Sequence, residues 1–263
     1  MYIIKVGGGS TINLEGVASD LATLEQPFLV VLGANALRDD LGLRLGQEKV
    51  QLTSVSGYSS VFSDADAIDL IMMAYSGLGN RRFVELCQRD GVNAIGLTGL
   101  DGRLVQGRRN RGIKVRENGK TMIKRDFSGK PAKVNVSLLT TLLDQGYRPV
   151  LSIPIIDEAG FAINSENDDI VVVLQDALKA DKVIQLIEAP GFLEDKNDEG
   201  SMLQTLSASE IKTREASVEG RMKRKMLALG RLFDAGAHEV IISDGRTTHP
   251  VLDALAGKGT TIR

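Results

Sequence analysis

Sulfur-containing and aromatic residues are scarce in this chain. Its 263 residues include no tryptophan, one cysteine and two histidines, and aromatic side chains make up 4% of the total. A single cysteine, Cys87, cannot form a disulfide within the chain, which is typical of a protein from a reducing cytoplasm. We expect Cys87 to pack inside a helix, because residues 82–88 have helical spacing. The lone cysteine, His238 and His249 show no spacing typical of a metal site.

Long apolar runs are also absent. No segment approaches the roughly 18 apolar residues that a membrane-spanning helix needs. The chain starts directly on a strand-like run, so we expect no signal peptide and a cytoplasmic location. No Gly-x-x-x-x-Gly-Lys-Ser/Thr segment is present, which excludes the common P-loop, and nothing supports a serine–histidine nucleophile. With 43% apolar residues, the chain could form one large α/β domain or two lobes that share a sheet.

Positive charge is concentrated in one segment. The formal net charge is −2, but residues 101–133 hold eleven lysines and arginines against three acids, a net of +8 that leaves −10 for the remainder. Asn118-Gly119 lies between two short alternating runs and predicts a β-hairpin within residues 108–127. A basic hairpin on an acidic body indicates a local anionic partner, and not a nucleic acid gripped by the whole surface. A solvated arm with no partner is the alternative.

Strand-like and helix-like segments alternate along the chain. This pattern favours an α/β fold with a mainly parallel sheet covered by helices on both faces. The expected strands are 2–6, 28–32, 148–153, 182–187 and 239–243. The expected helices are 13–24, 64–79 (with Ser63 as its N-cap), 134–145, 168–179 and 217–235. A polar loop at 157–167 predicts two lobes, residues 1–160 and 161–263.

Four polar or glycine-rich segments lie where the carboxyl ends of parallel strands would meet. They are Lys5 with Gly7-Gly8, then Gly33-Ala34-Asn35, then 164–169, and finally 220–225. Glycine lets backbone N–H groups approach a phosphate closely, and helix starts favour anions. Carboxyl ends of parallel strands border a common crevice, so we expect these segments to be neighbours.

Two lysines and one carboxylate in such a crevice suit phosphoryl transfer. Lys5 and Lys225 could stabilise the charge spread over a moving phosphoryl group, and Asp168 could orient them by ion pairing. Each residue also has a purely structural alternative: the glycines can form an ordinary turn, Lys225 can face solvent, and Asp168 can compensate a helix N-terminus.

Taken in order, these segments resemble the amino acid kinase family over essentially the whole chain. Within it the chain is most similar to the acetylglutamate kinases, and among those to kinases of aminoadipate or glutamate attached to an amino-group carrier protein. The resemblance rests on Lys5-Val-Gly-Gly, Asn93-Ala-Ile-Gly-Leu-Thr-Gly-Leu-Asp-Gly-Arg, Arg108-Arg109 followed by Glu117-Asn-Gly-Lys, Val134-Asn135, Gly146-Tyr-Arg-Pro-Val, Gly220-Arg-Met-Lys-Arg-Lys, and Asp244-Gly-Arg with Gly257-Lys-Gly-Thr.

The resemblance implies a three-layer αβα sandwich that phosphorylates a side-chain carboxylate with ATP, with Mg²⁺ carried by the nucleotide and not by a protein site. It implies that residues 1–160 form the acceptor lobe, that residues 161–263 form the ATP lobe, and that the protein is a homodimer. Helix 64–79 with Ile68, Met72 and Tyr75 is the candidate dimer face, and packing in the core is the alternative for the same spacing. The implied catalytic residues are Lys5, Asp168 and Lys225. The implied ATP-binding residues are Gly7, Gly8, Gly191, Met222 and Lys225. The implied acceptor-binding residues are Gly33, Ala34, Asn35, Ser59 and Asn164. The implied residues for a small acidic carrier protein are Arg108, Arg109, Arg111 and Lys114.

Three departures from the family pattern stand out. The family's His-Gly-Gly reads Leu32-Gly33-Ala34, so a methyl group could crowd the phosphate or oppose a positive φ. Residues 57–64 lack the arginine that usually binds the acceptor's free carboxylate. The family's Ser/Thr-Asp/Asn-Val reads Ile187-Glu188-Ala189, although Pro190-Gly191 follows as expected.

These departures leave two alternatives to a carboxylate kinase. The missing arginine would suit a kinase of the same fold with a different small acceptor. The changes at Ala34 and 187–189 would suit a regulatory protein that has lost catalysis. Retention of Lys5, Asp168 and Lys225 together argues against the regulatory alternative.

Overall fold

The core of the protein is a sheet of eight strands in the part of the chain that the structure describes. The computed structural model describes residues 1–263 except 48, 56–58, 118–119, 196 and 218–219. The strands follow the order β14-β16-β15-β13-β1-β2-β10-β5. Their bounds are β1 Tyr2–Val6, β2 Phe28–Leu32, β5 Ala94–Thr98, β10 Arg148–Ser152, β13 Lys182–Ile187, β14 Thr205–Leu206, β15 Val240–Asp244 and β16 Thr260–Ile262. The six strands from β15 to β5 are parallel, while β16 runs antiparallel to β15.

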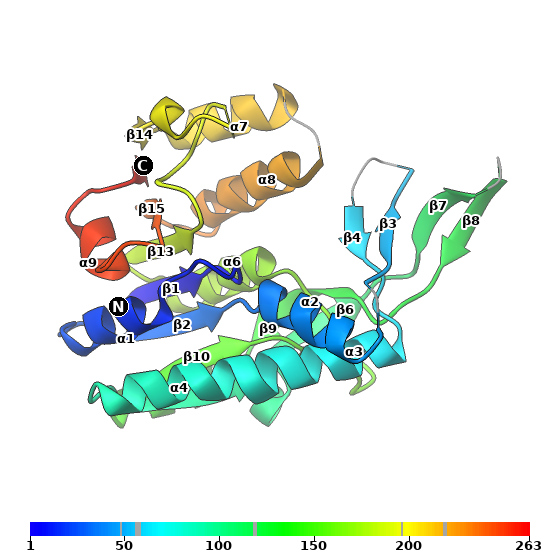
Figure 1. Cartoon of the computed structure of the whole chain (residues 1–263), viewed down its shortest axis with the longest axis horizontal. Coiled ribbons are helices and arrows are strands. Elements are labelled where there is room, and N and C mark those ends of the chain that lie inside the picture. Colours follow the sequence, from blue (N-terminus) through cyan, green and yellow to red (C-terminus); the bar gives the residue numbers. More distant parts are fainter. Residues whose placement is uncertain (48, 56–58, 118–119, 196, 218–219) are drawn as a thin grey trace.

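Helices cover both faces of this sheet, which confirms the predicted three-layer architecture (Figure 1). Successive strand residues point to opposite faces, so Ile3 and Val31 join one hydrophobic cluster while Ile4 and Val30 join the other. Helices α1 (Leu14–Ala22), α4 (Asn80–Arg89) and α9 (Pro250–Leu255) contribute to the second cluster. Helices α2 (Asn35–Arg44), α3 (Ala65–Ile71), α5 (Val136–Asp144), α6 (Asn167–Leu178), α7 (Ala208–Ser217) and α8 (Gly220–Asp234) contribute to the first. All five residues of β2 are buried, as burial on both faces requires.

Smaller sheets extend from the carboxyl end of the main sheet. Strands β12 (Ala162–Ile163), β11 (Ile155–Ile156), β6 (Val105–Arg109) and β9 (Gly129–Val134) form one of them. The hairpins β3–β4 (Gln51–Thr53 and Ser59–Val61) and β7–β8 (Ile113–Glu117 and Lys120–Lys124) project together at the right of Figure 1. Short 3-10 turns lie at Asp101–Arg103 (η2) and Glu199–Ser201 (η3).

The predicted basic hairpin is confirmed, but it is shorter than the predicted range. Strands β7 and β8 pair antiparallel from Ile113 opposite Lys124 to Glu117 opposite Lys120, while Asn118-Gly119 lie outside the described residues. The prediction was wrong for Arg108 and Arg109, which belong to β6 and pair with β9. The hairpin is also not a free arm, because Val115 is buried and Val55 N–H donates to the Lys114 carbonyl at 2.9 Å.

The helix predicted over 64–79 begins one residue later and is longer. Its N-cap is Asp64, whose side chain accepts from Ala67 N–H, and not Ser63. The helix continues through a π-helical segment, η1 (Met72–Gly79), directly into α4. Ile68 and Tyr75 are buried in the chain's own core, so for these two residues the core-packing alternative is confirmed and the dimer-face alternative is wrong.

Cys87 packs inside α4, as predicted. The side chain is fully buried, and burial raises the pKa of its thiol to about 12, so the residue is held as an unreactive thiol. Among the described residues, no helix is both long and apolar enough to span a membrane.

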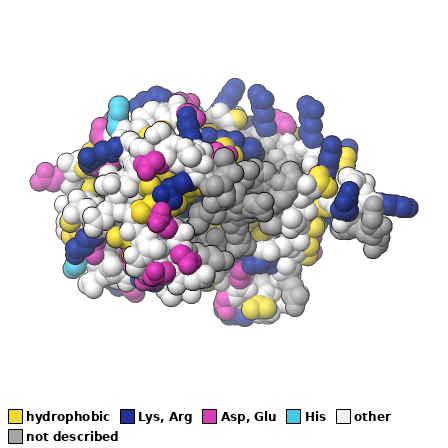
Figure 2. Space-filling model, turned by 90° about the horizontal axis from the view of Figure 1, so that it is seen from above, with side chains coloured by type: hydrophobic (Ala, Val, Ile, Leu, Met, Phe, Trp, Pro, Cys, Tyr) yellow, Lys and Arg dark blue, Asp and Glu magenta, His cyan; other side chains and the backbone are white. Residues whose placement is uncertain are grey.

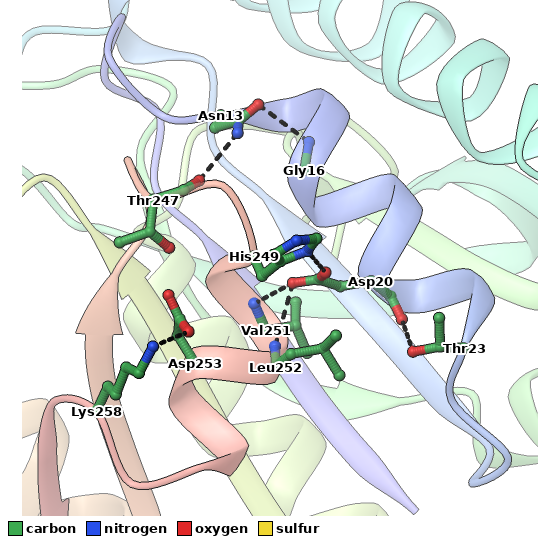
Figure 3. Close-up of polar contacts among 10 residues, drawn as sticks. All are labelled: Asn13, Gly16, Asp20, Thr23, Thr247, His249, Val251, Leu252, Asp253 and Lys258. Atoms are coloured by element: carbon green, nitrogen blue, oxygen red, sulfur yellow. Dashed lines mark hydrogen bonds and ion pairs between the residues drawn. The ribbon is translucent and has the colours of Figure 1, made fainter.

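A buried aspartate joins the beginning and the end of the chain (Figure 3). Asp20 on α1 is 1% exposed. It accepts hydrogen bonds from Val251 N–H at 2.8 Å and Leu252 N–H at 3.1 Å, and it pairs with His249 Nδ1 at 2.9 Å. These bonds satisfy backbone donors of the first turn of α9, which lack partners inside the helix. Asp20 therefore fixes α9 against α1.

Replacing Asp20 by asparagine is expected to lower the free energy of unfolding by about 1–2 kcal/mol, because an amide presents one acceptor oxygen where the carboxylate presents two. Urea unfolding measures the change. Asp234→Asn is the matched control, since Asp234 is 62% exposed and pairs only with Lys212 in the described part of the chain. Equal losses in the two variants would contradict the role of Asp20.

Candidate active site

A pocket of about 180 Å³ opens at the carboxyl ends of β1, β13 and β15. Its lining includes the charged residues Lys5, Asp168 and Lys225 and the buried Met226 and Leu229. The remaining lining residues come from the strands, from residues 189–193 and from α8: Gln185, Ile187, Ala189, Gly191, Phe192, Leu193, Ala228 and Ile242. Most of the lining side chains are thus apolar, and three are charged.

Lys5 and Asp168, far apart in sequence, form an ion pair in this pocket. Lys5 Nζ donates to Asp168 Oδ1, and the two side chains are 13% and 21% exposed. Strand β1 delivers Lys5, while Asp168 lies in the first turn of α6, so the carboxylate also faces a helix N-terminus. Because Lys225 lines the same pocket, the structure brings all three predicted catalytic residues to one place.

The two predicted glycine turns touch each other through their backbones. A Cβ on Gly8 would lie 2.5 Å from Asn35 N and 2.6 Å from Ala34 N, and a Cβ on Gly33 would lie 2.6 Å from Gly8 N. Ala36 N–H donates to the Gly8 carbonyl at 2.8 Å, and Gly33 N–H donates to the Val6 carbonyl at 2.9 Å. Close packing of two backbones, and not a positive φ, therefore requires glycine at both positions. This contact between the two glycine turns is called the cradle below.

Ala34 fits this cradle without backbone strain. Its φ is −149°, so the alanine needs no left-handed conformation, contrary to the concern raised by the sequence. The side chain is 7% exposed, and its methyl group lies near Gly79 of η1. The methyl group therefore packs against a helix in the core.

The start of α2 carries two polar features. Its N-cap, Ala34, provides no side-chain hydrogen bond to the first turn, where Ala36 N–H donates to the Gly8 carbonyl instead. Asn35 Oδ1 accepts from the hydroxyl of buried Tyr75. Burial raises the pKa of Tyr75 to about 12, so the phenol stays a neutral donor. With its oxygen occupied, Asn35 can offer its NH₂ group to a ligand.

Asn164 lies just before the start of α6, beside Ser63. Its Nδ2 donates to Ser63 Oγ at 3.0 Å, and its N–H donates to the Phe127 carbonyl at 2.7 Å. The predicted acceptor residue Ser59 belongs to β4, and its side chain lies outside the described residues.

Two polar atoms beside Asn164 and Asp168 are buried without a partner among the described residues. They are Ser165 Oγ and Asn167 Oδ1. Buried polar groups are normally hydrogen-bonded, so these two are candidates to contact a ligand. Sequence reasoning did not single them out, although both belong to the polar run 164–169 that marks this site.

Glu188, part of the departure from the family pattern at 187–189, has a structural contact. Its Oε1 accepts from Thr11 N–H at 3.0 Å and from Thr11 Oγ at 2.7 Å, and these hydrogen bonds lower the pKa of Glu188. The carboxylate therefore ties the loop after β13 to the glycine loop after β1. Sequence analysis missed this contact because the two residues are 177 positions apart.

Of the predicted ATP-binding residues Gly191 and Met222, the structure places Gly191 in the pocket. Gly191 lines the pocket, and a Cβ there would lie 2.7 Å from Thr260 Oγ1 and 2.9 Å from Met202 Sδ. Phe192 N–H donates to Thr260 Oγ1 at 2.8 Å. The side chain of Met222, on α8, lies outside the described part of the chain.

The four predicted carrier-binding residues differ in how exposed their side chains are and in what holds them. Arg108, Arg111 and Lys114 are exposed. Arg109 is held in place: its Nε donates to the Asp126 carbonyl at 2.8 Å, and its guanidinium lies 3.9 Å from the centre of the Phe127 ring. Among the described residues, no group of three or more His, Cys, Asp or Glu side chains could hold a metal ion.

Comparison with known proteins gives a consistent result. A model of the amino acid kinase family matches residues 1–244. A LysW-aminoadipate kinase of Thermus thermophilus is 38% identical over 269 residues, with 100% of both chains covered. A LysW-aminoadipate kinase of Deinococcus radiodurans is 36% identical, with 100% of this chain and 91% of that protein covered.

Solved structures support the fold. N-acetylglutamate synthase from Neisseria gonorrhoeae aligns with a TM-score of 0.79 at 20% identity, covering 99% of this chain and 58% of that one. Carbamate kinase from Giardia aligns with a TM-score of 0.69 at 16% identity, covering 99% and 97%.

Proposed function

The chain belongs to the amino acid kinase family, and we propose that it phosphorylates a side-chain carboxylate of an acidic amino-acid derivative with ATP. The product is an acyl phosphate. The acceptor is aminoadipate or glutamate whose amino group is acylated or attached to a carrier protein. One observation carries the proposal: the Lys5–Asp168 ion pair and Lys225 share one pocket.

In the proposed reaction an acceptor carboxylate oxygen forms a bond to the γ-phosphorus in line with the breaking bond to the β-phosphate oxygen, and ADP leaves. Lys5 and Lys225 stabilise the charge on the transferring group from two sides. Asp168 holds Lys5 in position. The acceptor needs no general base, because its carboxylate is already ionised at neutral pH.

For the nucleotide, the apolar side chains that line the pocket offer a surface for the base, while the close contact between Gly8 and Gly33 leaves no side chain there to obstruct the phosphates. Mg²⁺ is proposed to arrive on these phosphates, where it would neutralise part of their charge. Residues 161–263 would then form most of the ATP lobe, and residues 1–160 the acceptor lobe.

For the acceptor, the proposed contacts are the start of α2 with Gly33, Ala34 and Asn35, the β4 residue Ser59, and Asn164 beside Ser63. Ser165 and Asn167 add polar atoms without a partner in the described part of the chain. The acceptor would thus lie between α2 and the start of α6.

An acidic carrier protein is the proposed partner, since the relatives named above act on LysW-linked aminoadipate. Lysine and arginine side chains gather at the end of the molecule that bears the projecting hairpins (Figure 2). Arg108 on β6, Lys114 on β7 and Arg111 between these strands are exposed. Electrostatic attraction would bring the carrier to the acceptor end of the site.

Charge reversal at Arg108 and Arg111 is expected to weaken carrier binding at least roughly tenfold at low salt and to flatten its salt dependence. Calorimetric titration with the purified carrier at several salt concentrations measures both effects. Arg82→Glu is the control, because Arg82 lies on α4 and pairs with Glu85. Unchanged affinity and slope in the double variant would remove this surface from the proposal.

The proposal also covers the location of the protein, its binding partners and its oligomeric state. We infer a cytoplasmic protein that binds neither nucleic acid nor membrane, and a homodimer. Met73 and Leu78, which are 45% and 40% exposed on η1, are the apolar side chains available there to a second copy. Analytical ultracentrifugation tests the dimer.

The proposed function is tested by ATP turnover with hydroxylamine trapping. The acceptors are glutamate, aminoadipate, their N-acetyl forms and carrier-linked aminoadipate, each with and without Mg²⁺. Hydroxamate from an acylated or carrier-linked acceptor is the expected result. ATP binding without hydroxamate from any of them would favour the second candidate, a kinase of the same fold with another acceptor, which the lack of arginine in residues 57–64 favours.

A further inference from the structure

Gln185 is a polar residue inside a strand of the buried main sheet. It lies on β13, where all the other residues after Lys182 are apolar. Its side chain is 7% exposed. Interior parallel strands are covered on both faces and are normally apolar throughout, so a glutamine at this place departs from the pattern that the fold favours. Natural proteins depart from such patterns at functional sites.

The pairing of the central strands directs Gln185 into the pocket that the proposed catalytic residues line. Gln185 lies in register between Lys5 on β1 and Ile242 on β15. Residues in register on neighbouring strands point to the same face of a sheet. All three residues line the pocket. The side chain of Gln185 is therefore next to the lysine that is proposed to stabilise the transferred phosphoryl group.

The amide group of this side chain makes no hydrogen bond to any residue that the structure describes. Neither of its two polar atoms is sealed from solvent, in contrast to Ser165 Oγ and Asn167 Oδ1. Buried polar groups are nearly always hydrogen-bonded, and a buried group without a partner costs stability. The amide of Gln185 thus keeps an NH₂ donor and an oxygen acceptor for a molecule that enters the pocket.

The rest of the lining indicates which part of a nucleotide suits this amide. Apart from the three charged residues, the other described residues of the lining are apolar or glycine, among them Phe192, Leu193 and Leu229. A largely apolar pocket with one amide suits a flat ring that has a hydrogen-bonding edge. A phosphate group suits it less, because phosphate oxygens accept hydrogen bonds and offer no donor to the amide oxygen. The pocket, at about 180 Å³, is also smaller than the roughly 300–1,000 Å³ of pockets that take whole drug-sized ligands, so it suits one part of a nucleotide.

We propose that Gln185 recognises the adenine base of ATP. Its amide oxygen accepts from the exocyclic amino group of adenine, and its amide nitrogen donates to the adjacent ring nitrogen. Glutamine and adenine form such a pair of hydrogen bonds because each offers one donor and one acceptor side by side. This inference rests on the proposed function and deepens it, since it names the side chain that selects the base of the phosphoryl donor.

The test measures nucleotide affinity by calorimetric titration in the absence of any acceptor. The ligands are ATP and purine riboside triphosphate, which lacks the exocyclic amino group, each with Mg²⁺. The test variant is Gln185→Met, which replaces the amide by an apolar side chain of similar size. Gln88→Met is the matched control, because Gln88 is exposed on α4 and its amide donates to the Ala94 carbonyl at 2.9 Å, outside the pocket.

The wild type and Gln88→Met should bind ATP at least roughly tenfold more tightly than the analogue, the scale for leaving a buried polar group without its partner. Gln185→Met should bind the two nucleotides alike, as expected when the two deleted groups interact directly. Equal affinity of the wild type for the two nucleotides would overturn the proposal. Discrimination by Gln185→Met as strong as that of the wild type would also overturn it.

Unfolding without nucleotide separates recognition from a structural role. The urea midpoint of Gln185→Met should be no lower than that of the wild type, because the amide it removes has no hydrogen-bond partner in the described part of the chain. A clearly lower midpoint, or a variant that does not fold, would show that the amide supports the free protein and would overturn the proposal. The comparison of the two nucleotides on the wild type needs no variant.

The titrations contain no acceptor, so failure of this inference differs from failure of the proposed function. If the wild type yields no hydroxamate from any acceptor but discriminates between the two nucleotides through Gln185, the proposed function fails and the role of Gln185 stands. If hydroxamate forms and the discrimination is absent, the proposed function stands and the role of Gln185 fails. No binding of ATP to the wild type would overturn the role of Gln185.

Discussion

Replacing Lys5 or Lys225 by alanine is expected to reduce hydroxamate formation at least roughly 100-fold, the scale for losing one preorganised group that stabilises developing charge. For Lys5 the effect has a second source, because its loss leaves the Asp168 carboxylate without this ion pair in a pocket where it is 21% exposed. The loss should appear in kcat, since the charge stabilised by each lysine develops during transfer.

Lys212→Ala is the control for these variants, because Lys212 lies on α7 and its ion pair with Asp234 is exposed. Its turnover should stay close to that of the wild type. ATP affinity, measured separately by titration, should fall less than turnover in both active-site variants. Near-normal turnover in Lys5→Ala or Lys225→Ala would refute the role assigned to that lysine.

Gly8→Ala is expected to reduce turnover at least roughly 100-fold as well. The new methyl group would lie 2.5 Å from Asn35 N and 2.6 Å from Ala34 N, both backbone atoms that cannot swing away. The two glycine turns must therefore separate, and a displacement on the order of 1 Å in a phosphoryl-transfer site costs about this much.

Gly9→Ala is the matched control one residue away. A Cβ there would meet the Glu188 side chain, 1.9 Å from its Cδ, and that side chain can rotate. The substitution should break the hydrogen bonds between Thr11 and Glu188 but leave the contact between Gly8 and Gly33 intact. We therefore expect a loss of less than roughly tenfold, and equal losses in the two variants would contradict the cradle.

The placement of the site was predictable because its parts follow strands. Lys5, Gly33 and Asp168 each lie at a strand end or helix start that local pattern reveals, and the parallel-sheet rule then brings such ends together. Family resemblance added the pairing of Lys5 with Asp168, which the structure contains. The positions were therefore accessible to sequence reasoning, while the catalytic roles stay predictions.

Errors arose where tertiary contacts choose between locally equivalent residues. Ser63 and Asp64 are both good N-cap residues, but Ser63 bonds to Asn164 and Phe127, which leaves Asp64 to cap the helix. Arg109 was expected on a projecting arm, yet stacking on Phe127 and the register with β9 keep it on β6. Such choices depend on partners more than ten residues away, which a local pattern does not contain.

Strand β1 lies in the middle of the main sheet, between β2 and β13. Its neighbour β13, at Lys182–Ile187, is separated from it by most of the chain, and Asp168 comes only shortly before. During synthesis, Lys5 leaves the ribosome long before Asp168, so the ion pair cannot form until the 163 positions that separate the two residues have been made. A nascent chain interrupted before β13 therefore lacks four of the eight strands of the main sheet as well as Lys225, so the pocket that Lys5, Asp168 and Lys225 line together cannot yet form.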